Sequence, residues 1–307
     1  MEYVLRTFDL SKRYKKQWAL DKANINIQKG DIYGFVGENG SGKTTVIRLI
    51  TGLIFATEGS FELFGVPNTS PEILKVKKKI GAIVETPSIY LNMSAFDNLK
   101  MQCGILHVKD EAKIKEVLDE VGLLELYDNP KHAGDFSLGM RQRLGLAMAL
   151  LGDPELIILD EPMNGLDPAG IVEIRELILK LNRERAITFL ISSHILTELS
   201  LVANKYGIIS KGKIIKEITA EELKNECRRF TQIQTDDREA LYKLLSGEFQ
   251  SQDLAPTANG VTVYGNICLN ELFGKIIQAG ITISSVNCLE SSIEDYYLSL
   301  IGGARHA

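Results

Sequence analysis

Residues 37–44, which read Gly-Glu-Asn-Gly-Ser-Gly-Lys-Thr, constrain the fold of this chain more than any other stretch. They match the pattern G-x-x-x-x-G-K-[ST], in which glycines let backbone N–H groups converge on phosphate oxygens. Residues 31–36, which are mostly apolar, predict a buried strand, and residues 45–50 have helical apolar spacing. The loop therefore leads from a strand into a helix N-terminus, whose dipole attracts phosphate. This context predicts an α/β nucleotide-binding fold.

The residue types in this loop suggest separate roles. The charge of Lys43 suits the β- and γ-phosphates, and the hydroxyl of Thr44 suits Mg²⁺. A chance glycine-rich turn is the alternative, and the strand and helix on either side argue against it. The residues expected to contact the nucleotide are Gly37, Asn39, Gly40, Ser41, Gly42, Lys43, Thr44 and Thr45.

A second motif consists of an apolar strand at residues 156–159 followed by two carboxylates. Asp160 is expected to hold Mg²⁺, and Glu161 is expected to polarise the water that attacks the phosphate. An acidic pair that caps a helix is the alternative. We favour the catalytic interpretation because the preceding strand is apolar and a phosphate-binding loop lies upstream.

Composition excludes several classes of protein. The chain has 307 residues and a formal net charge of −5. This slightly acidic balance gives no support for a nucleic-acid partner, which usually requires a basic patch. Its four cysteines are scattered without a C-x-x-C pair, so neither a zinc site nor a disulfide scaffold is predicted. The N-terminus lacks the apolar core of a signal peptide, and no run approaches the ~18 apolar residues of a membrane span. If the protein acts at a membrane, we expect another chain to cross it.

The pattern along the chain predicts two domains. Residues 1–226 form an α/β nucleotide-binding domain with a helical subdomain at about 86–153, and residues 227–307 form a small α/β accessory domain without a phosphate-site motif. In the accessory domain, strands are predicted at 230–234, 260–264 and 282–287, and helices at 238–245, 269–278 and 292–300.

Residues 136–140, Phe-Ser-Leu-Gly-Met, lie between the two phosphate-site motifs. With them, residues 3–225 resemble the ATP-binding subunit of an ABC transporter, whose signature usually reads LSGGQ. Phe136, Leu138 and Met140 depart from that signature, whereas Ser137 and Gly139 match it. The resemblance implies that Ser137 and Gly139 contact the γ-phosphate of an ATP held by a second subunit. It therefore implies a head-to-tail dimer, which we expect to be a homodimer.

The same resemblance assigns further residues. Tyr14 stands where an aromatic ring stacks on adenine, and residues 164–167 stand where the D-loop lines the dimer interface. His194 matches the switch histidine, which contacts the γ-phosphate. Glu85 falls where the family normally has the Q-loop glutamine that senses Mg²⁺, so we expect Glu85 to contribute to the metal site.

Glu85 and residues 136–144 together resemble the branch that exports bacitracin and lantibiotics. The resemblance implies an ATP-hydrolysing subunit that binds ATP and Mg²⁺ and powers a separate transmembrane permease. It would be a peripheral protein of the cytoplasmic face of the cell membrane, exporting a peptide antibiotic or another amphipathic toxin. An ABC importer subunit remains an alternative, as does a soluble ABC ATPase without a transport role. Ribosome-remodelling ABC proteins carry two cassettes, and the DNA-repair type carries a long coiled coil, and neither feature is visible here.

Overall fold

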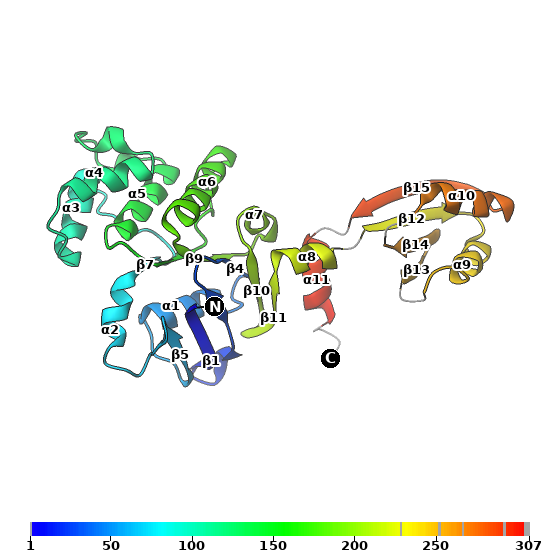
Figure 1. Ribbon diagram of the computed structural model, residues 1–307, viewed down its shortest axis with the longest axis horizontal. Coiled ribbons are helices and arrows are strands. Elements are labelled where there is room, and N and C mark those ends of the chain that lie inside the picture. Colours follow the sequence, from blue (N-terminus) through cyan, green and yellow to red (C-terminus); the bar gives the residue numbers. More distant parts are fainter. Residues whose placement is uncertain (1, 228, 251–252, 266, 291–292, 304–307) are drawn as a thin grey trace. The chain divides into compact units, whose positions relative to one another are not determined.

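The computed structural model describes residues 2–227, 229–250, 253–265, 267–290 and 293–303 (Figure 1). The chain divides into two compact units, Met1–Ala220 and Glu221–Ala307. Helix α8 (Ala220–Glu226) starts at this division and ends where the sequence-based boundary was placed.

A six-stranded sheet in the order β11-β10-β4-β9-β8-β7 carries the first unit. Every residue of β4 and β8 is buried, as expected for apolar strands covered on both faces. All neighbours in this sheet pair in parallel except β11, which pairs antiparallel with β10. The strands are β4 (Ile32–Val36), β7 (Ile80–Ile83), β8 (Leu156–Asp160), β9 (Thr188–Ser193), β10 (Lys205–Ser210) and β11 (Lys213–Thr219).

Two helices of the first unit begin at a capping serine. Ser94 Oγ accepts a hydrogen bond from Asp97 N at the start of α3, and Ser137 Oγ accepts one from Met140 N at the start of α5. Helices α3, α4 and α5 make up most of the helical segment (Figure 1). The helices are α1 (Lys43–Thr51), α2 (Ile73–Val76), α3 (Ala95–Leu106), α4 (Ala112–Glu120), α5 (Leu138–Leu150), α6 (Pro168–Arg185) and α7 (Leu196–Ser200).

An antiparallel sheet packs beside the phosphate loop. Its strands follow the order β2-β1-β5-β6, with β3 also paired to β1. Buried residues of this sheet, among them Leu10 and Leu20, share one core with Val46 and Ile50 of α1. The β1–β2 hairpin is thereby fixed next to the helix that follows the phosphate loop. The strands are β1 (Tyr3–Tyr14), β2 (Gln17–Ala23), β3 (Asn26–Gln28), β5 (Glu58–Leu63) and β6 (Val66–Pro67).

The second unit has a sheet and core of its own. Its antiparallel sheet follows the order β13-β14-β12-β15, and the chain runs β-α-β-β-α-β, which is the ferredoxin-like arrangement. Apolar residues of β12 and β14 share a buried cluster with α9 and α10, so both helices cover one face of the sheet. The elements are β12 (Arg229–Thr235), α9 (Arg238–Ser246), β13 (Leu254–Thr257), β14 (Gly260–Tyr264), α10 (Leu269–Gln278), β15 (Ile283–Glu290) and α11 (Ile293–Gly303).

None of the helices in the described ranges is long and apolar enough to cross a bilayer.

Candidate nucleotide-binding site

Three neighbouring strands bring the predicted site residues to one edge of the sheet. Strands β4, β9 and β8 lie side by side and parallel, so the chain leaves all three at the same edge. The phosphate loop follows β4, His194 follows β9, and Asp160 and Glu161 lie at the end of β8. Ligands of parallel α/β sheets bind at this carboxyl edge.

Glycine is required at several positions of the phosphate loop. Gly40 and Gly42 adopt φ angles of 78° and 114°, which side chains disfavour. A Cβ on Gly37 would lie 2.4 Å from the carbonyl oxygen of Ile209. Ser41 is buried, and its Oγ has no hydrogen-bond partner within the part of the chain that the structure describes. A buried hydroxyl without a partner fits a loop that binds an oxygen-rich ligand.

Lys43, Glu161 and His194 form one contact network. The buried Lys43 Nζ donates to Gly37 O at 2.6 Å and lies 3.2 Å from Glu161 Oε1. The other carboxylate oxygen of Glu161 lies 2.6 Å from Nδ1 of His194. Glu161 has a φ of 52°, and its N–H donates to Ser192 O and Oγ at 3.2 and 3.0 Å. The structure therefore brings these three predicted residues together.

The oxygen ligands expected for Mg²⁺ lie at the same edge. Asp160 is buried, and Ser192 Oγ donates to its Oδ1 at 2.6 Å. Thr44 and Thr45 lie half-buried in the first turn of α1. No group of three or more His, Cys, Asp or Glu able to hold a metal occurs among the described residues. The donor set of Asp160 and Thr44 fits Mg²⁺, which usually takes one or two carboxylates together with substrate phosphates and water.

Two residues near this edge were not singled out from the sequence. Ser192 orients Asp160 and anchors the backbone of Glu161. The available signal was a pair of serines that end an otherwise apolar strand. Glu198 of α7 is the second of these residues. Burial raises the pKa of its carboxyl, although the nearby His194 acts in the opposite direction.

Tyr14 lies beside the phosphate loop, as the resemblance implied for the residue that stacks on adenine. A cavity of about 500 Å³ lies between the β1–β2 hairpin, the loop and the β10–β11 turn. Its lining residues are Tyr14, Gln17, Trp18, Ala19, Gly40, Lys211 and Gly212. Trp18 was not predicted from the sequence, because its place in this cavity depends on its pairing with Arg13 across the hairpin.

Ser137 and Gly139 lie at the N-terminus of α5. A Cβ on Gly139 would lie 3.9 Å from Leu166 Cδ2, and one on Gly165 would lie 3.3 Å from Leu138 Cδ2. The signature segment therefore contacts the D-loop of its own chain.

Glu85 follows β7 with a φ of 64°, and its carboxylate forms an ion pair with Arg48 of α1. This partner of the carboxylate was not predicted from the sequence. Its expected contact with Mg²⁺ stays a prediction.

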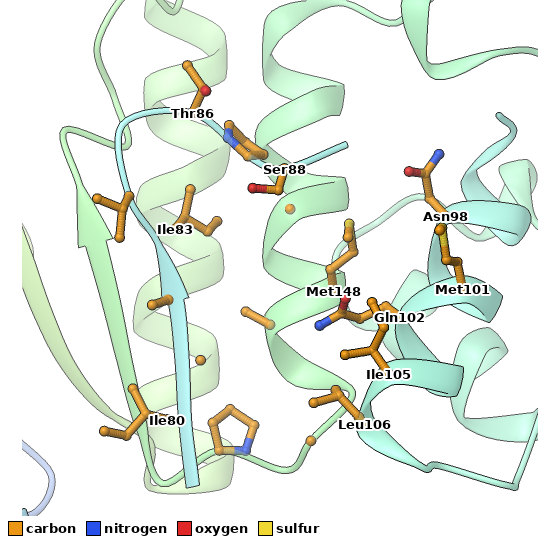
Figure 2. A pocket seen from close by; sticks show the side chains of 18 of the residues that line it. Ile80, Ile83, Thr86, Ser88, Asn98, Met101, Gln102, Ile105, Leu106 and Met148 are labelled. Atoms are coloured by element: carbon orange, nitrogen blue, oxygen red, sulfur yellow. The ribbon is translucent and has the colours of Figure 1, made fainter. Parts of the chain in front are cut away.

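A cavity of about 320 Å³ begins next to Glu85. Figure 2 shows it between β7, which contributes Ile80 and Ile83, and helices α3 and α5, which contribute Met101 and Met148. Thr86 and the residues that follow form its rim. Glu85 therefore stands between α1, with which it forms an ion pair, and a partly apolar groove, which its neighbours along the chain line.

A strand–loop–helix phosphate site, a carboxylate pair and a helical segment with a signature-like motif define an ATP-binding cassette. In agreement, residues 20–164 match the family model described as ABC transporter. The bacitracin transport ATP-binding protein BcrA of Bacillus licheniformis is 43% identical over 308 residues, which cover 99% of both chains. The lantibiotic transport ATP-binding protein SrtF of Streptococcus pyogenes is 44% identical over 214 residues, 70% of this chain and 90% of the relative. The chain therefore belongs to the ABC transporter family and is an ATP-binding and ATP-hydrolysing subunit.

Solved structures agree with this assignment. CbiO1 from Clostridium perfringens, part of the ABC transporter complex cbiONQ, has a TM-score of 0.65 and 27% identity, covering 73% of this chain and 91% of its own. The ADP conformation of MJ1267, an ATP-binding cassette of an ABC transporter, has a TM-score of 0.64 and 31% identity, covering 73% and 94%. The predicted P-loop fold and family are confirmed. Family membership implies ATP as the ligand and a membrane permease as the partner.

Proposed function

We propose that this chain forms a homodimer around two ATP molecules and powers a separate permease that exports a peptide antibiotic of the bacitracin type or another amphipathic toxin. It would do so as a peripheral subunit at the cytoplasmic face of the membrane. One observation carries the choice of substrate class. The similarity to the bacitracin transport protein extends over 99% of both chains, so it includes the second unit as well as the cassette.

The contacts at the sheet edge support specific roles in hydrolysis. Lys43 would neutralise charge on the β- and γ-phosphates, and Asp160 and Thr44 would hold Mg²⁺, which would supply further positive charge to them. Glu161 would act as the general base for the attacking water, and His194, 2.6 Å from it, would orient the carboxylate and contact the γ-phosphate. The positive φ of Glu161 supports this proposal, because strained backbone is typical of functional sites.

The signature segment supports a shared site between two copies. Ser137 and Gly139 lie at a helix N-terminus, where N–H groups attract phosphate. Gly139 and the adjacent Leu138 lie next to the D-loop of the same chain, so the signature segment stands beside the segment that is expected to line the dimer interface. Such an interface would form while the γ-phosphate is present and open after hydrolysis.

The groove in Figure 2 is a candidate for the permease contact. Ile105 and Met101 of α3 line it and are exposed, and exposed apolar side chains of this kind mark interaction sites. Glu85 and Arg48 would connect this groove with the phosphate-binding helix.

A resistance assay tests the proposed substrate class. A sensitive host that lacks the chain is complemented with its permease and either the wild-type protein or Glu161→Gln. We expect the wild type to raise the inhibitory concentration of bacitracin or a lantibiotic and Glu161→Gln to fail at equal expression. An ATPase-active wild type that protects against neither bacitracin nor a lantibiotic would refute the export of these peptide antibiotics. ATP-dependent accumulation of solute inside the cells would favour the importer alternative.

A further inference from the structure

The cavity next to the phosphate loop holds a second aromatic residue beside Tyr14. Trp18 lines the same cavity of about 500 Å³, and 36% of the residue is exposed, against 47% for Tyr14. It is the only tryptophan in the 307-residue sequence. A large aromatic side chain left this accessible in a cavity is unusual for a residue whose role is packing.

Backbone contacts fix the position of Trp18 relative to the phosphate loop. A Cβ on Gly42 would lie 2.7 Å from the carbonyl oxygen of Ala19, the residue after Trp18. Gly212 N donates to Ser41 O at 2.8 Å, and Asp21 N donates to Gly212 O at 2.8 Å. The start of β2, the β10–β11 turn and the loop therefore form one connected backbone unit. The backbone next to Trp18 is therefore fixed relative to the phosphate loop.

The charges around the two rings suit an electron-rich aromatic ligand with an anionic tail. The guanidinium carbon of Arg13 lies 5.1 Å from the ring centroid of Trp18, and Lys12 Nζ lies 5.2 Å from that of Tyr14. Lys211 adds another cation to the lining. Aromatic rings with adjacent cations are the usual surface on which nucleobases stack.

We propose that Trp18 is a second nucleobase-binding residue, which holds with Tyr14 the base of the nucleotide whose phosphates occupy residues 37–44. This inference rests on the proposed nucleotide site. Stacking tolerates every base, because every base has a π-face. The lining side chain of Gln17 carries both a donor and an acceptor, so it can pair with either purine edge. The site therefore takes purine nucleoside triphosphates as a class, and ATP and GTP bind with affinities within about tenfold of each other.

The test separates the base from the phosphates. Binding of ATP, GTP and inorganic tripolyphosphate to the full chain is measured by calorimetry in magnesium-free buffer, which prevents hydrolysis. We expect Trp18→Ala to bind ATP and GTP about tenfold more weakly, with tripolyphosphate unchanged. Trp18→Phe should retain most of the affinity. Phe8→Ala is the matched control, because Phe8 lies on β1, is 41% exposed and is not among the residues that line the cavity.

Tryptophan fluorescence of the wild type gives a second readout that needs no substitution. ATP and GTP should change the emission of Trp18, and tripolyphosphate should leave it unchanged. An equal loss of affinity for all three ligands in Trp18→Ala, or no loss for any, would overturn the proposal. A loss confined to ATP would overturn its purine tolerance. A wild type that binds neither ATP nor tripolyphosphate would instead refute the nucleotide site itself.

Discussion

At the scale of single residues, Lys43 is a buried charge whose partners are two carbonyl oxygens and the Glu161 carboxylate. Charge stabilisation dominates phosphoryl transfer, so we expect Lys43→Ala to lower ATP turnover by about 100-fold or more. Phosphate release by the purified protein measures this. Lys180→Ala, an exposed position on α6, is the control. Turnover within a few-fold of wild type would show that the loop does not bind the reacting phosphates.

Glu85 could act through Mg²⁺ or through its ion pair with Arg48, and exchanging the charges of the pair distinguishes these two roles. If Glu85 contributes to Mg²⁺ binding, Glu85→Ala should weaken the Mg²⁺ dependence of hydrolysis. If its partner is Arg48, as the ion pair indicates, Arg48→Ala should reduce permease-coupled resistance as much as Glu85→Ala does. The double variant Arg48→Glu with Glu85→Arg should then restore resistance. Such exposed pairs contribute about 0.2 to 1 kcal/mol to folding, so the unfolding midpoint should barely move. Unchanged Mg²⁺ titrations and unchanged resistance would make Glu85 a solvated loop residue.

Three of the predicted site residues could be read from the sequence alone. Lys43, Asp160 and Glu161 belong to contiguous motifs, in which residue type and spacing carry the chemistry. Ser192 and Trp18 were missed because their roles depend on neighbours across strands, Asp160 for the serine and Arg13 for the tryptophan. A single sequence without strand pairing does not indicate such partners.

At the scale of elements, the spacing of apolar residues predicted both the type and the bounds of some helices and strands. Strand β14 and helix α10 have the bounds that the sequence indicated. Strand β13 was not predicted, because Pro256 argues against a strand, and β13 indeed lies at the edge of its sheet, where proline is tolerated. The ferredoxin-like order of that sheet was not foreseeable either, because it results from pairing between strands far apart in the sequence.

An ion pair at the ends of two neighbouring strands gives a pH prediction. Lys79 Nζ precedes β7 and lies 2.7 Å from Glu155 Oε1, which precedes β8. The hydrogen bond from Lys79 lowers the pKa of the Glu155 carboxyl below its ordinary value of 4.5. A lowered folded-state pKa stabilises the protein above the unfolded-state pKa, and this contribution is lost as the pH falls through the folded-state value.

We therefore expect Glu155→Gln to lower the free energy of unfolding at about pH 7 by about 0.5 kcal/mol, a small value because the carboxylate is 37% exposed. The difference should shrink as the pH falls below the ordinary pKa and disappear once the Glu155 carboxyl is protonated in the folded protein as well. Urea unfolding at several pH values measures this, with the exposed Glu125→Gln as control. A difference that persists in acid would mean that packing, and not charge, is responsible.

At the scale of the whole molecule, Glu161→Gln tests the proposed dimer. The amide keeps the shape of the carboxylate but accepts no proton from water, so ATP should bind and remain unhydrolysed. Light scattering with MgATP should then show about twice the monomer mass, and the same variant with Ser137→Arg should stay monomeric. ATP binding without any increase in mass would contradict the two-subunit site.

The separate cores of the two units lead to a prediction about truncation. Every proposed site residue lies before Ala220, and the second unit buries its own cluster, which includes Ile233, Leu241 and Val261. Units with cores of their own usually fold independently. A chain that ends at Glu226 should therefore bind ATP within about threefold of the full-length affinity, a difference below 1 kcal/mol.

Circular dichroism and calorimetry on the truncated chain measure folding and affinity separately. The isolated residues 227–307 provide the matched control, since they should fold without binding ATP. A truncated chain that is folded but does not bind ATP would show that the boundary is wrong or that the units depend on each other. If ATP binding persists and resistance in the host is lost, the second unit acts in transport rather than in nucleotide binding.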